Sequence, residues 1–294
     1  MSGNEIVQIG PDDKILSPLL DPIFKALFTS ETAESREALK DFISTYIGKK
    51  VKEVRIVGNE PAVFMVDDKQ IRYDVNCVFD NGEKCNVEMT VFPSLHEHLR
   101  IEYYVSRLFV SQKTKGNRDW GKLKEAYQIS IIVNDKIFKD ESLIHGFEYY
   151  DRKNNISLNG KTHIITVELS KLKSEREEDL EKLTGKELWA MFFKYAEKID
   201  KRELVNEIVR TDRGISMATQ ELLRISKDDE MQLRAISEEK RLTDYDMDMN
   251  SWISWGREEG LREGIEKSKR EIAENMRRQG FTDKQIKSVL GIEI

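Results

Sequence analysis

The segment Ile71–Thr90 reads IRYDVNCVFDNGEKCNVEMT, with apolar and polar residues alternating on either side of Asp80-Asn81-Gly82. Such alternation predicts two β-strands, and the Asp-Asn-Gly sequence predicts the turn that joins them. Each predicted strand carries one carboxylate, Asp74 on the first and Glu88 on the second. The predicted fold and the predicted site both depend on this hairpin.

The length of the turn decides whether the two carboxylates meet. A two-residue Asn81-Gly82 turn pairs Asp74 with Met89 and puts Asp74 and Glu88 on opposite faces. A three-residue loop, with Asp80 and Asn81 right-handed and Gly82 left-handed as a bulge, pairs Asp74 with Glu88. We predict the three-residue loop because it groups the polar side chains of both strands on one face. That face holds Asp74, Asn76, Asn86 and Glu88, and the opposite face holds Tyr73, Val75, Cys77, Phe79, Cys85, Val87 and Met89.

Four segments around and within the hairpin carry a resemblance to a known family. They are LSPLLDPIFKALF at Leu16–Phe28, NVEMT at Asn86–Thr90, RIEYYVSRL at Arg100–Leu108 and AENMRRQGFTDKQIKSVLG at Ala273–Gly291. In this order they resemble the Rpn-type recombination-promoting nuclease and transposase family of the PD-(D/E)XK nuclease superfamily. The resemblance extends from about Leu16 to Gly291.

The resemblance implies a fold, an activity and a cofactor. It implies an α/β fold in which a restriction-endonuclease-like core, a mixed sheet flanked by helices, precedes an all-helical C-terminal region. It also implies a DNA endonuclease that requires Mg²⁺ or Mn²⁺ and is associated with recombination and transposition. The chain departs from the family pattern at Thr90, where the family has Lys or Gln.

The hairpin carboxylates suit the chemistry of a metal-dependent nuclease. Directly opposed residues have Cβ atoms about 5 Å apart, near enough for Asp74 and Glu88 to share one cation. These carboxylates and the Met89 carbonyl are hard oxygen ligands of the kind that Mg²⁺ and Mn²⁺ prefer. Such an ion lowers the pKa of a bound water and stabilises an anionic transition state.

Thr90 leaves three outcomes open. The missing cation comes from elsewhere, either from Lys25 or from Arg72, which the predicted register places opposite Thr90. Alternatively the enzyme is slow. In the third outcome the site is degenerate, and the protein binds DNA without cutting it.

Two predicted helices contribute further candidate residues. Asp21 and Lys25 stand four residues apart on a helix from about Asp21 to Phe28, so they form either an ordinary ion pair or part of the site. On a second helix, from about Glu97 to Ser111, Arg100, Tyr104 and Arg107 share one face. Arginines that flank an aromatic ring suit DNA backbone and base contacts, and the alternative is a solvated helix face.

Composition sets broader limits. The net charge of −6 gives no overall basic excess to attract nucleic acid, although a basic face is still compatible with it. The two cysteines, Cys77 and Cys85, predict a reducing, cytoplasmic setting and pack as small buried residues in the predicted register. No apolar run approaches the roughly 20 residues of a membrane span, so we expect no membrane association.

A change in composition after Leu172 divides the chain. Residues 1–172 hold 24 basic and 26 acidic residues, whereas residues 173–294, with 24 and 28, are more densely charged and contain no proline. We therefore predict a nuclease-like core over residues 1–172, with strands that include 51–57, 62–66, 128–133 and 161–169. We predict a helical region over residues 173–294 that ends in a helical hairpin.

Three glycines mark the helical region. Gly256, Gly260 and Gly264 recur every four residues, which places them on one side of a helix. Each glycine costs about 1 kcal/mol relative to alanine in a helix interior. Close pairing of helices from two copies of the chain, giving a homodimer, is one explanation, and a hinge is the other. The final hairpin resembles a helix-turn-helix but equally suits a packing cap.

Overall fold

The computed structural model describes residues 7–58, 71–112, 120–173 and 177–291. Contacts between Cα atoms divide the chain into two compact units, Met1–Glu238 and Glu239–Ile294. The predicted domain boundary at residue 172 falls shortly after the last strand of the sheet, and the division between the compact units follows residue 238. The strand predicted at residues 62–66 lies outside the described residues.

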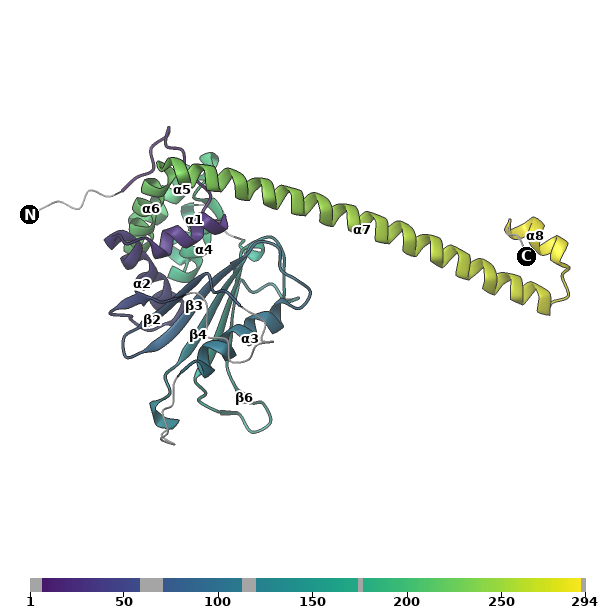
Figure 1. Ribbon diagram of the computed structural model, residues 1–294, viewed down its shortest axis with the longest axis horizontal. Coiled ribbons are helices and arrows are strands. Elements are labelled where there is room, and N and C mark those ends of the chain that lie inside the picture. The colour runs from purple at the N-terminus through teal and green to yellow at the C-terminus, as the bar shows by residue number, and fades with distance from the viewer. Residues whose placement is uncertain (1–6, 59–70, 113–119, 174–176, 292–294) are drawn as a thin grey trace, which may run out of the picture. The chain divides into compact units, whose positions relative to one another are not determined.

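A six-stranded mixed sheet forms the centre of the first unit (Figure 1). Its order is β1-β2-β3-β4-β8-β5, and β3, β4 and β8 run parallel to one another. The other pairings are antiparallel. The strands are β1 Val54–Ile56, β2 Val75–Phe79, β3 Glu83–Thr90, β4 Ala126–Ile132, β5 Ile144–Phe147 and β8 Thr162–Glu168, and a separate ribbon consists of β6 Tyr150–Asp151 and β7 Ile156–Ser157. The predicted architecture, a mixed sheet flanked by helices, is confirmed.

The hairpin has the register that the polarity of its residues predicts. Val75 pairs with Val87 and Phe79 pairs with Glu83, which leaves a three-residue loop. Gly82 is left-handed, with φ 94°, as predicted. The prediction for Asp80 is wrong, because its φ of 43° is also left-handed. The Asp80 carboxylate accepts hydrogen bonds from the N–H groups of Lys52 and Glu53, and these contacts with the neighbouring chain hold the turn in that conformation.

Helices cover both faces of the sheet (Figure 1). On one face α3 packs against β3, β4 and β8, while α1 and α2 contact β2 and β1 and form a layer with the helices that follow the sheet. The helices of the first unit are α1 Asp21–Thr29, α2 Ala33–Ile47, α3 Glu97–Val110, α4 Gly185–Tyr195, α5 Arg202–Thr211 and α6 Arg213–Ser226, with short 3-10 turns at Trp120–Lys122, Leu169–Lys171, Glu177–Lys182 and Ile199–Lys201.

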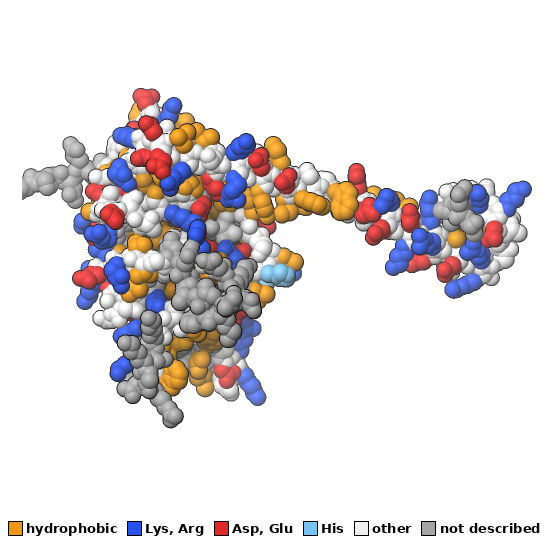
Figure 2. Space-filling model, viewed as in Figure 1, with side chains coloured by type: hydrophobic (Ala, Val, Ile, Leu, Met, Phe, Trp, Pro, Cys, Tyr) orange, Lys and Arg blue, Asp and Glu red, His pale blue; other side chains and the backbone are white. Residues whose placement is uncertain are grey.

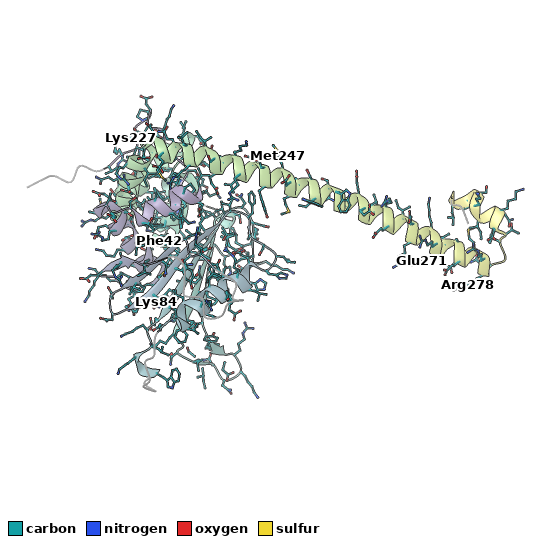
Figure 3. All side chains as sticks on the ribbon, in the orientation of Figure 1. Phe42, Lys84, Lys227, Met247, Glu271 and Arg278 are labelled. Carbon is teal, nitrogen blue, oxygen red and sulfur yellow. The ribbon has the colours of Figure 1, made fainter. Side chains whose placement is uncertain are left out.

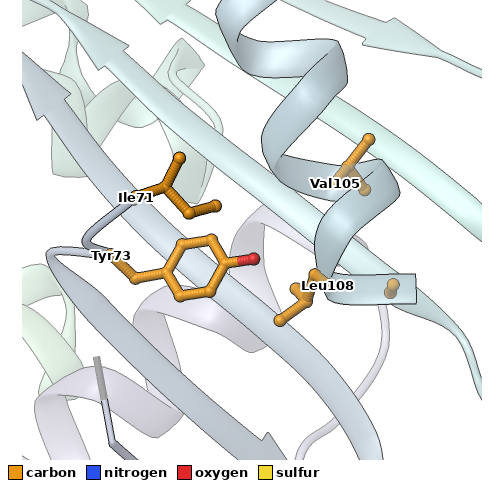
Figure 4. Close-up of a cluster of buried hydrophobic side chains, with 5 residues drawn as sticks. Ile71, Tyr73, Val105 and Leu108 are labelled. Atoms are coloured by element: carbon orange, nitrogen blue, oxygen red, sulfur yellow. The ribbon is translucent and has the colours of Figure 1, made fainter. Parts of the chain in front are cut away.

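Two groups of apolar side chains hold these layers together. Between α1, α2 and α4, aromatic rings interlock, with Phe42 at 5.1 Å from Phe28 and 5.2 Å from Trp189, measured between ring centroids. Beneath α3, Tyr73 joins a buried cluster with Ile71, Val105, Leu108 and Ala126 (Figure 4). Strict alternation predicts Tyr73 on the other face, but the residues before Val75 are not regular strand, so the alternation does not extend to them.

The second unit contains most of one long helix. Helix α7 spans Asp229–Arg278 without a break and passes through Gly256, Gly260 and Gly264, so no hinge interrupts it at the glycines. Helix α8 Asp283–Leu290 begins with a capping box of Thr282 and Gln285 and completes the predicted helical hairpin. Figure 3 shows Met247, Glu271 and Arg278 along α7. Within the described residues no helix has the length and apolar character needed to cross a membrane.

Candidate active site

Helix α1 brings two of the predicted site residues to the hairpin. The Lys25 ammonium lies 2.7 Å from an Asp21 oxygen, one helical turn away, and 3.0 Å from Oδ1 of Asp74. The helix fixes this geometry because Ile23, Phe24, Leu27 and Phe28 bury its opposite side. The Asp21–Lys25 ion pair is therefore part of a three-residue group that includes a hairpin carboxylate.

Asp74 lies immediately before β2 and is 8% exposed. Its Oδ2 atom accepts a hydrogen bond from the Met89 N–H at 3.2 Å, so the contact with Met89 is made through the amide nitrogen. One further step of the β2–β3 register places Asp74 opposite Glu88. Burial raises the pKa of Asp74, the Lys25 charge lowers it and the Asp21 charge raises it, with a net upward shift.

Glu88 lies on β3 and is 5% exposed. One carboxylate oxygen accepts a hydrogen bond from Asn86 Nδ2 at 3.0 Å, and the other lies 2.9 Å from Arg100 Nη1. Burial and, next in size, the negative charge of Asp74 raise the pKa of Glu88 to about 7, although Arg100 opposes the shift. The Asp74 carboxylate therefore lies close enough to Glu88 for its charge to resist ionisation of Glu88.

Arg100 supplies a cation beside the residue that departs from the family pattern. Its Nη2 atom donates to the Thr90 hydroxyl at 2.6 Å, and its Nε donates to Glu97 at 2.8 Å. Its guanidinium also lies 5.2 Å from the centre of the Tyr104 ring, a cation–π contact. The contacts with carboxylates raise the pKa of Arg100 further above its already high value, so it is always charged.

A buried chain of hydrogen bonds extends from Glu88 along the sheet. Asn86 Nδ2 also donates to Gln128 Oε1, and Gln128 Nε2 donates to Ser130 Oγ, each at 3.0 Å. Gln128 is fully buried and Ser130 is 1% exposed. A satisfied network of this kind holds Asn86, and with it the carboxylate of Glu88, in one orientation.

The remaining predicted residues take different positions. Arg72 is exposed on the segment before β2, and its predicted opposition to Thr90 lies beyond the last paired residues, Val75 and Val87. Arg107 is half-buried, and its charge lowers the pKa of the buried Tyr73, which burial raises overall. Tyr104 contacts both Arg100 and Tyr73, with the two tyrosine rings 5.7 Å apart.

Three residues of the site have no role in the sequence-based prediction. Glu97 is 2% exposed and binds Arg100, Thr90 and the Ser94 N–H. Its spacing of three residues from Arg100 is the signal that could have identified the pair. Gln128 and Ser130 stand at alternate positions of a strand that is otherwise apolar, which marks them as buried polar residues.

The donor set fits a divalent cation. Asp74 and Glu88 provide carboxylate oxygens, and a cation bound between them would offset the burial and the neighbouring negative charge that raise their pKa values. In the part of the chain that the structure describes, no three His, Cys, Asp or Glu side chains are grouped so that they could hold a metal ion. Two carboxylates are sufficient for Mg²⁺, which usually completes its coordination with water and substrate phosphate oxygens.

One of the comparisons with known proteins finds a match. The family model described as PD-(D/E)XK nuclease family transposase matches residues 18–253, a range that contains every residue of the site. Neither the curated proteins nor the solved structures include a match to the chain.

Proposed function

Because the chain belongs to the PD-(D/E)XK nuclease family transposases, we propose that it is a Mg²⁺-dependent DNA endonuclease that acts in recombination or transposition. The observation that supports this proposal most strongly is the pair of buried carboxylates, Asp74 and Glu88, with raised pKa values. Burying two acids close together is costly, so a purely structural role is a poor explanation for them. A cofactor that binds both acids would account for them.

Asp74 and Glu88 would hold the metal ion. When bound, Mg²⁺ would supply an activated water and charge for the phosphate. Mn²⁺ takes the same oxygen ligands and is the alternative ion. Asp21 and Lys25 act through Asp74. The Lys25 ammonium contacts the carboxylates of Asp21 and Asp74 and sets the orientation of the Asp74 side chain.

We assign to Arg100 the place that Lys or Gln has in the family pattern, and Arg100, like Lys, brings a positive charge there. Arg100 contacts Glu88 and the Thr90 hydroxyl, and it is one-third exposed, so its charge can also reach a phosphate at the site. The ring of Tyr104 makes a cation–π contact with the Arg100 guanidinium. We propose that Arg72 and Arg107, with Arg100 and Tyr104, contribute the contacts to DNA. On the face drawn in Figure 2 acidic and basic side chains are interspersed.

Nicking of plasmid DNA in Mg²⁺ or Mn²⁺ tests the activity. The wild type should nick, and Asp74→Ala and Glu88→Ala should reduce nicking to background. Glu31→Ala, which removes an exposed acid before α2, should leave the rate unchanged. Nicking that persists in both site variants would refute the metal assignment.

The degenerate alternative, DNA binding without cutting, makes a separable prediction about Thr90. If Arg100 replaces the missing family residue, Thr90→Lys places a second cation next to Arg100. The variant should then nick more slowly than the wild type. If the site is degenerate, the wild type should not nick, its DNA binding should weaken steeply with salt, and Thr90→Lys should create activity.

We also propose that α7 forms a homodimer. Gly256, Gly260 and Gly264 have no atom within 4 Å of an added Cβ, and Trp252 and Trp255 are 68% and 60% exposed. Figure 2 shows hydrophobic side chains along this helix. A helix that exposes tryptophans and contains three glycines gains little stability by itself, and pairing with a second copy would bury this surface.

The charges of α7 favour an antiparallel pair. Residues 239–250 hold four acidic and two basic residues, and residues 265–278 hold three acidic and five basic residues. An antiparallel arrangement centred on the glycines sets the acidic stretch of one copy against the basic stretch of the other. Light scattering should give the mass of a dimer for the wild type and of a monomer for Gly260→Leu, which blocks the close approach.

We further propose a cytoplasmic location, because Cys77 and Cys85 are opposed, fully buried and free.

A further inference from the structure

A second concave site lies on the other side of α3 from the carboxylates. It is a cleft of about 320 Å³ between α3, β8 and β5. Its lining includes the aromatic residues Phe138, Phe147 and Tyr149, the acidic residues Glu102 and Glu148, and Thr166. This volume is at the lower end for ligand sites, so the cleft is suited to one small ring system.

The Thr166 hydroxyl is the feature of the cleft that indicates a ligand, because its hydrogen-bonding capacity is not used within the protein. Thr166 is 1% exposed, and its Oγ1 atom has no hydrogen-bond partner. A buried hydroxyl without a partner is costly, and a ligand with a polar edge would satisfy it. An apolar side chain in the cleft would leave that cost in place.

The aromatic wall of the cleft is held in position by a buried ion pair. Glu168 is completely buried, binds the Lys171 ammonium and accepts a hydrogen bond from the Phe138 N–H at 3.3 Å. Phe138 in turn lies 5.2 Å from Phe147, measured between ring centroids. The rings are therefore set before any ligand arrives, which reduces the entropic cost of binding a flat molecule.

We propose that this cleft binds one unpaired base of the DNA substrate, and that it favours a base with an exocyclic amino group. Aromatic rings stack on the face of any base, and the Thr166 hydroxyl can bond its polar edge. Glu102 and Glu148 accept hydrogen bonds from an amino group and repel phosphate, as carboxylates do when they read cytosine. A base that is paired in a duplex cannot enter a cleft enclosed by a helix and a sheet, so the base must be unpaired.

The distance to the carboxylates fits a base close to the cut. In the sheet register Glu88 lies beside Ser130, and Ser130 lies beside Thr166. Two strand spacings separate Glu88 from Thr166 by about 10 Å, a span of one or two nucleotides. The inference rests on the proposed nuclease function, and it specifies the substrate as DNA with an unpaired nucleotide next to the scissile bond.

Fluorescence of a single-stranded oligonucleotide with one 2-aminopurine tests this proposal. The full chain carrying Glu88→Gln, which prevents cutting, should quench the fluorescence as the base stacks. Adding Tyr149→Ala should weaken binding about tenfold. Tyr150→Ala is the matched control, since Tyr150 is the next tyrosine, is similarly exposed at 48% and does not line the cleft, and it should bind as the parent does.

Thr166→Val separates a binding role from a structural one. Because the hydroxyl has no partner in the protein, its removal should leave the unfolding midpoint unchanged or higher while weakening binding of the 2-aminopurine strand. A strand with thymine in its place, measured by competition with the 2-aminopurine strand, should bind the parent more weakly, because thymine has no amino group to donate to Glu102 and Glu148. The proposal is overturned if Tyr149→Ala behaves like Tyr150→Ala, or if a duplex binds with the same dependence on Tyr149. Absence of nicking by the wild type, with quenching intact, would count against the nuclease function alone.

Discussion

Replacing Glu88 by Gln should stabilise the metal-free protein at pH 8 and change its stability little at pH 5. Glu88 is 5% exposed, and folding raises its pKa from 4.5 to about 7. A carboxyl group with a raised pKa contributes its full stabilisation below its unfolded pKa and loses it as pH rises through its folded pKa. The wild type should therefore lose stability between about pH 4.5 and 7, and Gln, which does not ionise, should not.

The size of the effect follows from the same shift. One pKa unit corresponds to about 1.4 kcal/mol, so ionisation of Glu88 in the folded protein costs about 3 kcal/mol at pH 8. The Asp74 charge is part of this cost, and titration of the two acids is coupled. A gain of about 2 kcal/mol in Glu88→Gln at pH 8 would agree with this reasoning.

Urea unfolding at pH 5 and pH 8, with and without Mg²⁺, measures the effect. In Mg²⁺ the order should reverse, because the ion stabilises only the protein that binds it. Glu97→Gln is the control, because it also removes a buried carboxylate bound to Arg100, at 2.6 Å, but should destabilise the protein at both pH values. A Glu88→Gln variant that is no more stable than wild type at pH 8 would contradict the claim that ionisation of the buried Glu88 beside Asp74 destabilises the folded protein.

Three further substitutions probe the supports of the site and the fold. Lys25→Met removes the ammonium that lies 3.0 Å from the buried Asp74 carboxylate and should cost about 2 kcal/mol at pH 8, with a smaller loss at pH 4, in urea unfolding. Gly82→Ala should cost about 1–2 kcal/mol, since φ is 94° and the nearest atom, on Lys124, is an ordinary 3.9 Å from the new Cβ. Gly214→Ala puts its Cβ 2.1 Å from Asp41 Cγ, so it should lower the thermal midpoint and, by moving Asp41 from the Trp189 indole, change the tryptophan fluorescence.

The hairpin could be predicted because one physical rule decides it. Its residues separate into a polar and an apolar face in only one of the two candidate registers, and a shift of one strand by one residue would mix the two sets on both faces. The pairing of Cys77 with Cys85 and of Asn76 with Asn86 follows from that rule. The rule fails at Tyr73, which packs under α3, because alternation constrains only residues inside a strand.

Other features depend on contacts that the local sequence does not contain. Asp80 is left-handed because its carboxylate binds the N–H groups of Lys52 and Glu53, almost thirty residues earlier in the chain. The short strands β5, β6 and β7 carry weak patterns and owe their place to pairing with β8 or with each other. Helix α7 continues through three glycines, whose cost made a break plausible from sequence.

The position of Arg100 shows why the departure at Thr90 could not be interpreted from the motif alone. A motif fixes residues by their spacing along the chain, whereas catalysis depends on where a charge lies in space. Thr90 has no charge, but its hydroxyl accepts a hydrogen bond from the guanidinium of Arg100, ten residues later, because α3 turns back over the end of β3. Glu97 binds the same guanidinium from the preceding turn of the helix and sets its direction. A helix residue can therefore supply a positive charge at the position where the family pattern has a strand residue. Thr90 is for this reason weak evidence for a degenerate enzyme, and loss of Arg100 would be stronger evidence for one.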